Sequence, residues 1–310
     1  VQIFALFSLN RAALAEPARA TGPWKLVRRA GHWLRRNSRT GSRRNIHFHY
    51  DLGNDFYRAW LDAGMTYSSA VFVDPGQSLE AAQDAKLRLM LDRTATRPGD
   101  TILEIGCGWG SFAELALVGG REVHGVTLST EQLAYAASRN PAGRFSLTDY
   151  RDVAGTYDAV VSIEMAEAVG RRYWPAYLSA IAKALKPGGH AALQIITFDD
   201  ALFHGYAANV DFIQTYIFPG GLLISATEFR RMAATQGLSW RDEARFGASY
   251  AETLKRWREN FDAAAAAGTL PAQFDARFVA LWRYYLMYCE GGFRGGGIDV
   301  VQVTLVKERE

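Results

Sequence analysis

From Thr101 onward, short apolar runs rich in β-branched residues alternate with longer stretches whose apolar positions recur at helical spacing. Such alternation predicts βαβ units and a mostly parallel sheet. We expect strands at residues 101–105, 122–127, 157–163 and 190–197, and helices at 78–95, 110–119, 130–138 and 174–186. The sequence Lys-Pro-Gly-Gly at 186–189 predicts a turn that ends one helix before the next strand. The expected fold class is α/β with a Rossmann-like arrangement.

The regular alternation stops at an aromatic-rich stretch, residues 203–221, that fits neither the helical nor the strand period. We interpret this stretch as an inserted lid or a wall of the substrate site. Helical patterns follow at 226–236, 250–266 and 274–290, before a glycine-rich loop at 291–297 and a final strand at 298–307. We therefore expect an N-terminal segment, residues 1–45, and one domain, residues 46–310, with an insertion at about 200–255.

The distribution of charge sets the first 50 residues apart. They carry ten Lys or Arg and one acid, Glu16, so that a net charge of +9 lies there although the whole chain carries +3. Trp24 and Trp33 are interleaved with the basic residues, a composition typical of a helix that lies on anionic headgroups. A solvated helix that covers part of the core, or a basic arm that binds nucleic acid, would have a similar composition.

Chain length and cysteine usage narrow the class of protein. With 310 residues and 49% apolar content, the chain is able to bury a large core. Cys107 and Cys289 lie far apart and form no metal-ligand spacing, so neither a zinc site nor a disulfide framework is expected. Because no apolar run reaches the ~20 residues that span a bilayer, we expect a cytoplasmic protein whose membrane contact is peripheral, at the inner face.

The first chemical motif is the glycine-rich sequence Glu104-Ile-Gly-Cys-Gly-Trp-Gly110, which lies between a predicted strand and a predicted helix. Such a turn lets the backbone approach a ligand closely. A nicotinamide-binding site would need GxGxxG and an acid about 20 residues further on, but the second strand ends at Thr127 without a carboxylate. The spacing is instead typical of S-adenosylmethionine-dependent methyltransferases, with a plain strand-turn-helix as the alternative.

Several separated motifs then resemble those of cyclopropane fatty acid synthases and the related mycolic acid methyltransferases. They are His49-Tyr-Asp-Leu-Gly-Asn-Asp-Phe-Tyr57, Met65-Thr-Tyr-Ser68, Gly125-Val-Thr-Leu-Ser129, Ser162-Ile-Glu-Met165, Tyr216-Ile-Phe-Pro-Gly-Gly221 and Tyr285-Leu-Met-Tyr-Cys289. The resemblance runs from about residue 45 to the end of the chain. It implies a class I methyltransferase fold, S-adenosylmethionine as cofactor, and the unsaturated acyl chains of phospholipids as substrate.

The resemblance also implies cofactor-binding residues. Glu104 with Gly106, Gly108 and Gly110 would hold the methionine part of the cofactor, Tyr67 and Ser68 would close over it, Thr127, Leu128 and Gln132 would follow the second strand, and Tyr150 with Arg151 would border the adenine. Gln132 would hydrogen-bond the ribose in place of the missing carboxylate. For each residue taken alone, a turn or cap hydrogen bond, or packing in the core, is the alternative.

The expected chemistry needs no activated nucleophile in the protein. An alkene attacks the sulfonium methyl group without losing a proton first, so catalysis must come from positioning, exclusion of water and electrostatics. Methyl transfer leaves a cation on the lipid, which aromatic faces stabilise. Candidates to line the acyl tunnel are Phe203, Tyr206, Phe212, Tyr216 and Phe218, with core packing as the alternative for each.

Ring closure needs a base, which the family is thought to supply as a bound bicarbonate. The resemblance assigns Glu167 and Tyr250 to that site, but Ser69 stands where a cysteine is expected and Gln194 where a histidine is expected. Bicarbonate binding and cyclopropane formation are therefore less well supported than methyl transfer. A methyl-branched or methylene chain is the alternative product, with Glu167 itself as a candidate proton acceptor. Cys289 is interpreted as a packed helical residue, with a catalytic thiol as the alternative.

Two classes of function stay open. The first is a lipid methyltransferase, and the second is a non-catalytic relative that binds lipid or cofactor. A methyltransferase acting on nucleic acid or a small molecule would suit the cofactor fold but not the aromatic insertion, so no nucleic-acid partner is expected. No metal is expected, and the oligomeric state, with a homodimer among the candidates, is left open.

Overall fold

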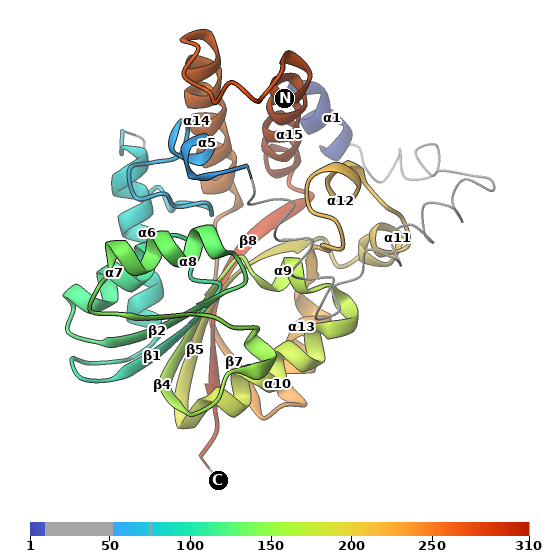
Figure 1. Ribbon diagram of the computed structural model, residues 1–310. Coiled ribbons are helices and arrows are strands. Elements are labelled where there is room, and N and C mark those ends of the chain that lie inside the picture. The colour runs from blue at the N-terminus through green and yellow to red at the C-terminus, as the bar shows by residue number, and fades with distance from the viewer. Residues whose placement is uncertain (10–51, 75, 310) are drawn as a thin grey trace.

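The computed structural model describes residues 1–9, 52–74 and 76–309 (Figure 1). In this part of the chain one sheet has the strand order β3-β2-β1-β4-β5-β8-β7, and β6 pairs with β5. The strands are β1 (Thr101–Ile105), β2 (Glu122–Thr127), β3 (Arg144–Leu147), β4 (Tyr157–Ile163), β5 (Leu185–Phe198), β6 (Ile224–Ser225), β7 (Leu238–Arg245) and β8 (Ile298–Lys307). Only β8 runs antiparallel to its neighbours, β5 and β7. The predicted Rossmann-like fold with a mostly parallel sheet is confirmed.

Helices cover both faces of the sheet and one of its ends. They are α1 (Gln2–Leu9), α5 (Asn54–Arg58), α6 (Leu79–Arg93), α7 (Ser111–Val118), α8 (Thr130–Arg139), α9 (Ala166–Val169), α10 (Trp174–Ala184), α11 (Phe203–Ala207), α12 (Phe212–Tyr216), α13 (Ala226–Ala234), α14 (Gly247–Ala266) and α15 (Ala276–Arg294). The described residues also form two short 3₁₀ helices, η1 (Tyr150–Asp152) and η2 (Arg171–Tyr173). In Figure 1, α1, α5, α14 and α15 gather at one end of the sheet.

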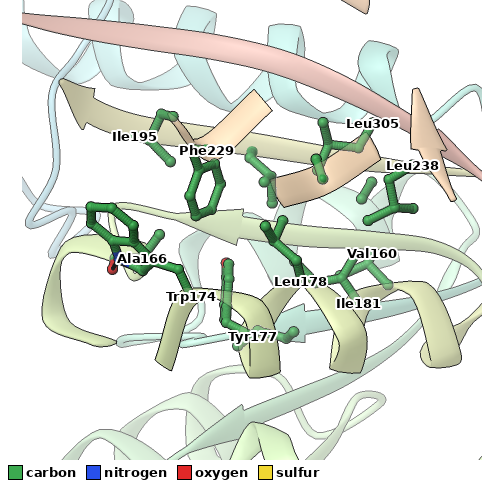
Figure 2. Close-up of a cluster of buried hydrophobic side chains, with 14 of the residues drawn as sticks. Val160, Ala166, Trp174, Tyr177, Leu178, Ile181, Ile195, Phe229, Leu238 and Leu305 are labelled. Atoms are coloured by element: carbon green, nitrogen blue, oxygen red, sulfur yellow. Dashed lines mark hydrogen bonds between the residues drawn. The ribbon is translucent and has the colours of Figure 1, made fainter. Parts of the chain in front are cut away.

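The central strands β1 and β4 are buried on both faces, as expected of parallel strands between two helical layers. Successive residues of one strand serve opposite layers. Ile102 belongs to the apolar cluster under α6 and α7, whereas Leu103 belongs to the cluster under α10 and α13. Figure 2 shows the second cluster, in which Leu178 and Phe229 from these two helices pack toward the sheet.

A third cluster, rich in aromatic residues, lies between α5, α14 and α15. Phe56 packs edge-on against Trp282 with ring centroids 5.0 Å apart, and Trp60 packs edge-on against Trp257 at 5.6 Å. Aromatic side chains bury large areas and prefer such edge-to-face contacts. Its side chains hold α5, α14 and α15 together at one end of the sheet (Figure 1).

Two predicted element boundaries are wrong. Residues 186–189 are not a turn, because α10 ends at Ala184 and β5 already begins at Leu185. The Pro-Gly-Gly sequence is instead accommodated by an irregular pairing with β4, whose register shifts between Tyr157 and Ala159. The predicted loop at 291–297 is also too long, since α15 continues to Arg294.

The structure adds elements that the sequence pattern did not predict. The aromatic stretch 203–221 holds two short helices, α11 and α12, and the edge strand β7 was missed. Within the predicted insertion at about 200–255, both β6 and β7 pair with the central sheet. Of the N-terminal segment 1–45, residues 10–45 lie outside the described residues, while α1 packs against α15.

Candidate active site

A cavity of about 800 Å³ lies where β1, β2 and β4 end. β1 pairs with β2 on one side and with β4 on the other, so the chain leaves neighbouring strands in opposite directions at this point. Ligands of open α/β sheets bind at such a switch point, outside the carboxyl ends of the strands. The cavity is lined by the glycine loop, by residues 65–68, by the β4–α9 connection and by parts of α12, α14 and α15.

The three glycines of the loop after β1 have different roles. All adopt positive φ, of 80° at Gly106, 50° at Gly108 and 84° at Gly110. A Cβ atom at Gly106 would overlap Met165, and one at Gly110 would lie 2.5 Å from the Asn140 amide nitrogen. A Cβ atom at Gly108 would have no heavy atom within 4 Å. Gly108 therefore borders the space for a ligand, whereas Gly110, which does not line the cavity, serves packing and the start of α7.

Glu104 and Lys86 place opposite charges beside the loop. Among the described residues, the buried Oε2 of Glu104 has no hydrogen-bond partner, and burial raises the pKa of this carboxyl group well above its ordinary value. The ammonium of Lys86 is fully buried and donates a 2.7 Å hydrogen bond to the Ser68 hydroxyl. Burial lowers the pKa of Lys86 to about 8, against the opposing influence of Glu164, Asp62 and Glu104.

The sequence analysis missed Lys86. A signal was present, because Lys86 lies on the buried face of α6 together with Ala82 and Met90. A lysine at a core-facing helical position is rare unless its charge has a partner. That placement alone would have marked it as a candidate for a buried ion pair or a ligand contact.

Side chains after β2 present hydrogen-bond donors to the cavity. The Thr127 hydroxyl donates to Gln132 Oε1 at 3.0 Å, which turns the Gln132 amide NH₂ toward other acceptors, while Ser129 caps α8. Thr127, Leu128 and Gln132 all line the cavity. They are thus available to a ribose, the partner expected for Gln132.

Tyr150, predicted to border the adenine, also lines the cavity and packs edge-on against Tyr177 with centroids 5.4 Å apart. Arg151 differs from its prediction. Its Nε donates to Asp149 Oδ1 at 2.7 Å, and it is not among the residues that line the cavity. Tyr67 and Ser68 line the cavity on the opposite side, where the Tyr67 hydroxyl contacts that of Tyr285 at 2.8 Å.

Three of the four residues assigned to the bicarbonate site converge on a protein carboxylate, that of Glu164. The Ser69 backbone N–H and the Gln194 Nε2 both donate to Glu164 Oε1 at 2.8 Å, and the Tyr250 hydroxyl donates to Oε2 at 2.8 Å. Ser69 and Gln194 are fully buried and do not line the cavity. In the structure both residues hydrogen-bond Glu164, which does line the cavity, and their contact with a bound bicarbonate stays a prediction.

Glu164 was not singled out from the sequence, although it lies in the quoted motif Ser162-Ile-Glu-Met165. It lines the cavity directly after β4 and has a positive φ of 51°, a conformation that costs a side-chain-bearing residue free energy. Burial raises its pKa, whereas the hydrogen bonds from Ser69, Gln194 and Tyr250 act in the opposite direction. Three donors to one carboxylate favour its ionised form.

Glu167 lies one turn further on, in α9, and also lines the cavity. Its Oε1 accepts the Ile196 N–H, and its buried Oε2 has no partner among the described residues. Burial, and next the charge of Glu164, raise the pKa of Glu167 to about 8. Burial and the neighbouring charge of Glu164 therefore favour the protonated form of Glu167 at neutral pH, while the hydrogen bonds to Glu164 oppose the effect of burial on its own carboxyl group.

The predicted tunnel aromatics divide into two groups. Tyr206 and Phe218 line the cavity. Phe203 is buried in the core, Phe212 packs edge-on against Tyr284 with centroids 4.8 Å apart, and the side chain of Tyr216 is 57% exposed. The tunnel prediction is wrong for these three, because the short helices α11 and α12 turn them away from the cavity.

Cys289, on α15, lines the cavity and is half-buried. Burial strongly raises the pKa of its thiol, the opposite of what a nucleophilic thiolate requires. In residues 1–9, 52–74 and 76–309, no three His, Cys, Asp or Glu side chains are grouped as metal ligands. No helix of that part is both long and apolar enough to cross a bilayer.

This sheet order, with a glycine loop at the switch point after β1, is the fold of an S-adenosylmethionine-dependent methyltransferase. Comparison with known proteins narrows the class. Residues 37–303 match the family model described as mycolic acid cyclopropane synthetase, and the chain belongs to that family.

Individual relatives agree with this assignment. The chain is 42% identical to tuberculostearic acid methyltransferase UfaA1 of Mycobacterium tuberculosis, over 92% of this chain and 72% of that protein. It is 37% identical to cyclopropane-fatty-acyl-phospholipid synthase of Escherichia coli K12, over 83% of this chain and 66% of that protein. The mycolic acid cyclopropane synthase CmaA1, solved with SAH and CTAB, aligns with a TM-score of 0.80 and 31% identity over 86% of this chain and 98% of that chain. The chain thus spans about two thirds of the E. coli relative's length.

Proposed function

We propose that this protein transfers a methyl group from S-adenosylmethionine to the double bond of an unsaturated fatty acyl chain in a phospholipid, and that its product is at least partly uncyclised. A methyl-branched or methylene chain is the proposed product, and a cyclopropane is the alternative. The observation that carries the proposal is that Ser69, Gln194 and Tyr250 hydrogen-bond the carboxylate of Glu164. A protein carboxylate thus takes the place that the family resemblance gives to bicarbonate.

The lining residues suit the cofactor. The open side of Gly108 leaves room for the methionine part, the free Oε2 of Glu104 is an acceptor for an ammonium group, and the Gln132 amide is a donor for a ribose hydroxyl. When bound, the cofactor supplies the electrophilic methyl group that the alkene takes up.

The protein's own residues then control the cation that remains on the acyl chain. Ile196, Phe198 and Leu254 line the cavity and keep water from that cation. The faces of Tyr206 and Phe218 are within the same lining and stabilise positive charge through their π-systems. Hydride migration from the methylated carbon to its neighbour gives the more substituted cation without adding or removing atoms.

Loss of one proton completes the reaction, and we assign its acceptance to Glu164. The C–H electron pair becomes the new C=C bond and the proton goes to the Glu164 carboxylate, so the lipid leaves neutral. Glu167, protonated at neutral pH, lowers the repulsion that a second carboxylate would exert. This assignment replaces the earlier candidate Glu167, because a protonated carboxyl group is not a base.

The names of two relatives are consistent with an acyl substrate. The relative that is 42% identical is a tuberculostearic acid methyltransferase, whereas the E. coli cyclopropane-fatty-acyl-phospholipid synthase is 37% identical. Both names refer to fatty acyl products, which supports an acyl substrate for this chain.

We further propose that the protein binds the inner face of an anionic membrane peripherally. The basic arm at residues 11–44, with Trp24 and Trp33, supports this, although it lies outside the described residues. Among the described residues, Phe4 of α1 lines the cavity while Ile3 and Leu9 of the same helix are exposed. An apolar helix surface beside the cavity would suit the transfer of an acyl chain from a bilayer.

The test is product analysis. Purified protein is incubated with methyl-labelled S-adenosylmethionine and vesicles of a cis-monounsaturated phospholipid, and the released acyl chains are separated by gas chromatography with mass spectrometry. We expect labelled methylene or methyl-branched chains. Exclusively cyclopropane chains would contradict the proposed product, and no labelled chain at all would contradict the proposed substrate.

A further inference from the structure

A line of polar side chains leads from the Glu164 carboxylate to a cation outside the cavity. Gln194 donates from Nε2 to Glu164 Oε1 at 2.8 Å, and its own Oε1 accepts from Gln302 Nε2 at 3.0 Å. Gln302 Oε1 in turn accepts from Arg93 Nε at 3.2 Å. Gln194, Gln302 and Arg93 are not among the residues that line the cavity. A substrate in the cavity therefore does not touch them.

Three elements of the fold build this line. Gln194 and Gln302 are partners in the antiparallel strands β5 and β8, so their side chains share one face of the sheet. α6 packs against both strands, and Arg93 is its last residue. Both glutamines are buried. Because a buried amide without a partner is costly, each amide in the line depends on its neighbours.

The guanidinium of Arg93 sets the direction of the whole line. A guanidinium donates and never accepts, so Gln302 must present its carbonyl oxygen to Arg93 and its NH₂ to Gln194. Gln194 must then accept with its oxygen, which leaves its NH₂ for Glu164 and for the Ser69 carbonyl at 3.2 Å. Reversing either amide would bring two oxygens or two NH₂ groups together.

Arg93 is itself held in place. Its Nη1 donates to the backbone carbonyl of Asp242 and to Thr304 Oγ1 at 3.4 Å. Hydrogen bonds in a chain polarise one another, and buried surroundings screen a charge less than water does. A fixed cation at one end of two aligned amides therefore strengthens the donor at the other end, the Gln194 NH₂ on Glu164.

We propose that Arg93 is a positioning residue for the removal of the lipid proton, which it serves by holding the Gln194 NH₂ on Glu164 through Gln302. The inference rests on the proposed role of Glu164 as the base. The line matters most once Glu164 has taken up a proton, because a neutral carboxyl group no longer fixes the Gln194 amide. A reversed amide would accept the new O–H with its oxygen and stabilise the protonated form. Arg93 opposes that reversal and so favours return of Glu164 to its ionised form.

Other charged and titratable groups also face Glu164. The charge of Lys86, from α6, and the hydrogen bond from Tyr250, on α14, favour its ionised form. Glu167, on α9, opposes that form when it is ionised as well, since the charge of Glu164 raises the pKa of Glu167. The variants below leave these three groups unchanged, so a difference between variants reports the line from Arg93.

The test is the pH profile of kcat for lipid methylation by the full chain. The acid limb of this profile reports the base in the enzyme–substrate complex. Arg93→Met should move the limb upward by about 0.5–1 pH unit, so that kcat on the acid side falls about 3- to 10-fold, while KM for the lipid changes less than about twofold. Arg93→Lys keeps a cation that donates and should restore the native limb.

Gln302→Glu reverses the line at nearly constant size. A carboxylate at this position accepts from Arg93 and needs a donor from Gln194, which turns the Gln194 oxygen toward Glu164. The acid limb should therefore move further than in Arg93→Met. Thr304→Val is the matched control, because it removes another contact of Arg93 and leaves the line intact. Its limb should coincide with that of the native protein.

An acid limb that stays in place in Arg93→Met, with kcat lowered equally at every pH, would make Arg93 merely structural and overturn the inference. Should Arg93→Met fail to fold, Gln302→Glu decides by the same criterion. Failure of the proposed function has a different signature. Native protein that forms no methylated lipid, or a profile that Glu164→Gln leaves unchanged, would contradict Glu164 as the base, and the inference would fall with it.

Discussion

Replacing Glu164 by glutamine or by glycine separates methyl transfer from proton removal. Glutamine keeps the size of the side chain but cannot accept a proton from the lipid cation. A well-placed general base contributes about 10²–10⁴-fold to the rate, so Glu164→Gln should lower the steady-state rate at which the methylated, deprotonated lipid product forms by at least about 100-fold. Affinity for S-adenosylmethionine should change little, because the proposed cofactor contacts come from other residues.

Glycine at position 164 should produce a different defect. It adopts the observed φ of 51° without the ~1–2 kcal/mol that this conformation costs a residue with a Cβ atom. It also leaves the Ser69 N–H and the Tyr250 hydroxyl without an acceptor, at about 1–3 kcal/mol for each buried group, while Gln194 keeps only its bond to the Ser69 carbonyl. The net effect should be a loss of several kcal/mol that a small bound anion can offset.

The assay for Glu164→Gly is therefore chemical rescue. Added bicarbonate or formate should raise the unfolding temperature of the variant and restore part of its turnover, and bicarbonate should increase the cyclopropane fraction of the product. Native protein and Glu164→Gln, both of which still fill the site, serve as controls and should not respond. Turnover of Glu164→Gln within about threefold of the native rate would refute the assignment of Glu164 as the base.

Three further predictions follow from the site and the basic arm. Gly108→Val should lower the affinity for S-adenosylmethionine at least about 100-fold, because its side chain enters the open space beside the loop; calorimetry showing unchanged affinity would contradict the site. Glu167 has its pKa raised from 4.5 to about 8 in the folded state, so the folded protein binds more protons and its unfolding free energy falls as pH rises through this window. Glu167→Gln should abolish this fall in unfolding free energy. If denaturant titrations from pH 4.5 to 8 give the same change in unfolding free energy for both proteins, the raised pKa of Glu167 is excluded. Vesicle binding through residues 11–44 should require anionic lipid and weaken steeply with salt, whereas equal sedimentation with neutral lipid would assign the arm another purpose.

The central sheet was predictable because its strands are buried runs that alternate with helical patterns. β7 was missed for a physical reason. It is an edge strand whose sequence, Leu-Ser-Trp-Arg-Asp-Glu-Ala-Arg from Leu238 to Arg245, has a single fully buried position, so its polar residues resemble a loop. Pairing with β8 stabilises β7 as a strand, although its own polar composition does not favour one.

The extension of α15 through Gly291 depends on tertiary packing. Glycine weakens an isolated helix, and two of them in succession favoured a loop in the sequence analysis. In the structure a Cβ atom at Gly291 would overlap Phe4 of α1, so glycine is what permits the two helices to pack closely. A contact between residues almost 290 positions apart leaves no trace in local sequence periodicity.

The same dependence on contacts between distant residues explains which parts of the candidate site could be predicted from the sequence. The glycine loop and Gln132 were found because their chemistry is local, following directly on single strands. Glu164 needs donors from three distant segments, those of Ser69, Gln194 and Tyr250, before its role is visible. From the sequence, Ser69 and Gln194 were understood as substitutions that weaken an anion site, but both still donate hydrogen bonds, and their acceptor in the structure is the carboxylate of Glu164.

A tethered carboxylate changes what the enzyme must do between turnovers. An exchangeable anion can leave with its proton, whereas Glu164 must lose the proton while it stays in a buried site. Tyr250, Ser69 and Gln194 stabilise its ionised form, which favours that loss. The adjacent Glu167, when protonated, adds no charge that would oppose this loss, but the burial of Glu164 does oppose it. Proton release should therefore be slow relative to an exposed carboxyl group, and Tyr250→Phe, which removes one stabilising donor, should slow steady-state turnover more than the first turnover. Equal losses in a single-turnover and a steady-state experiment would place the effect of Tyr250 before proton release instead.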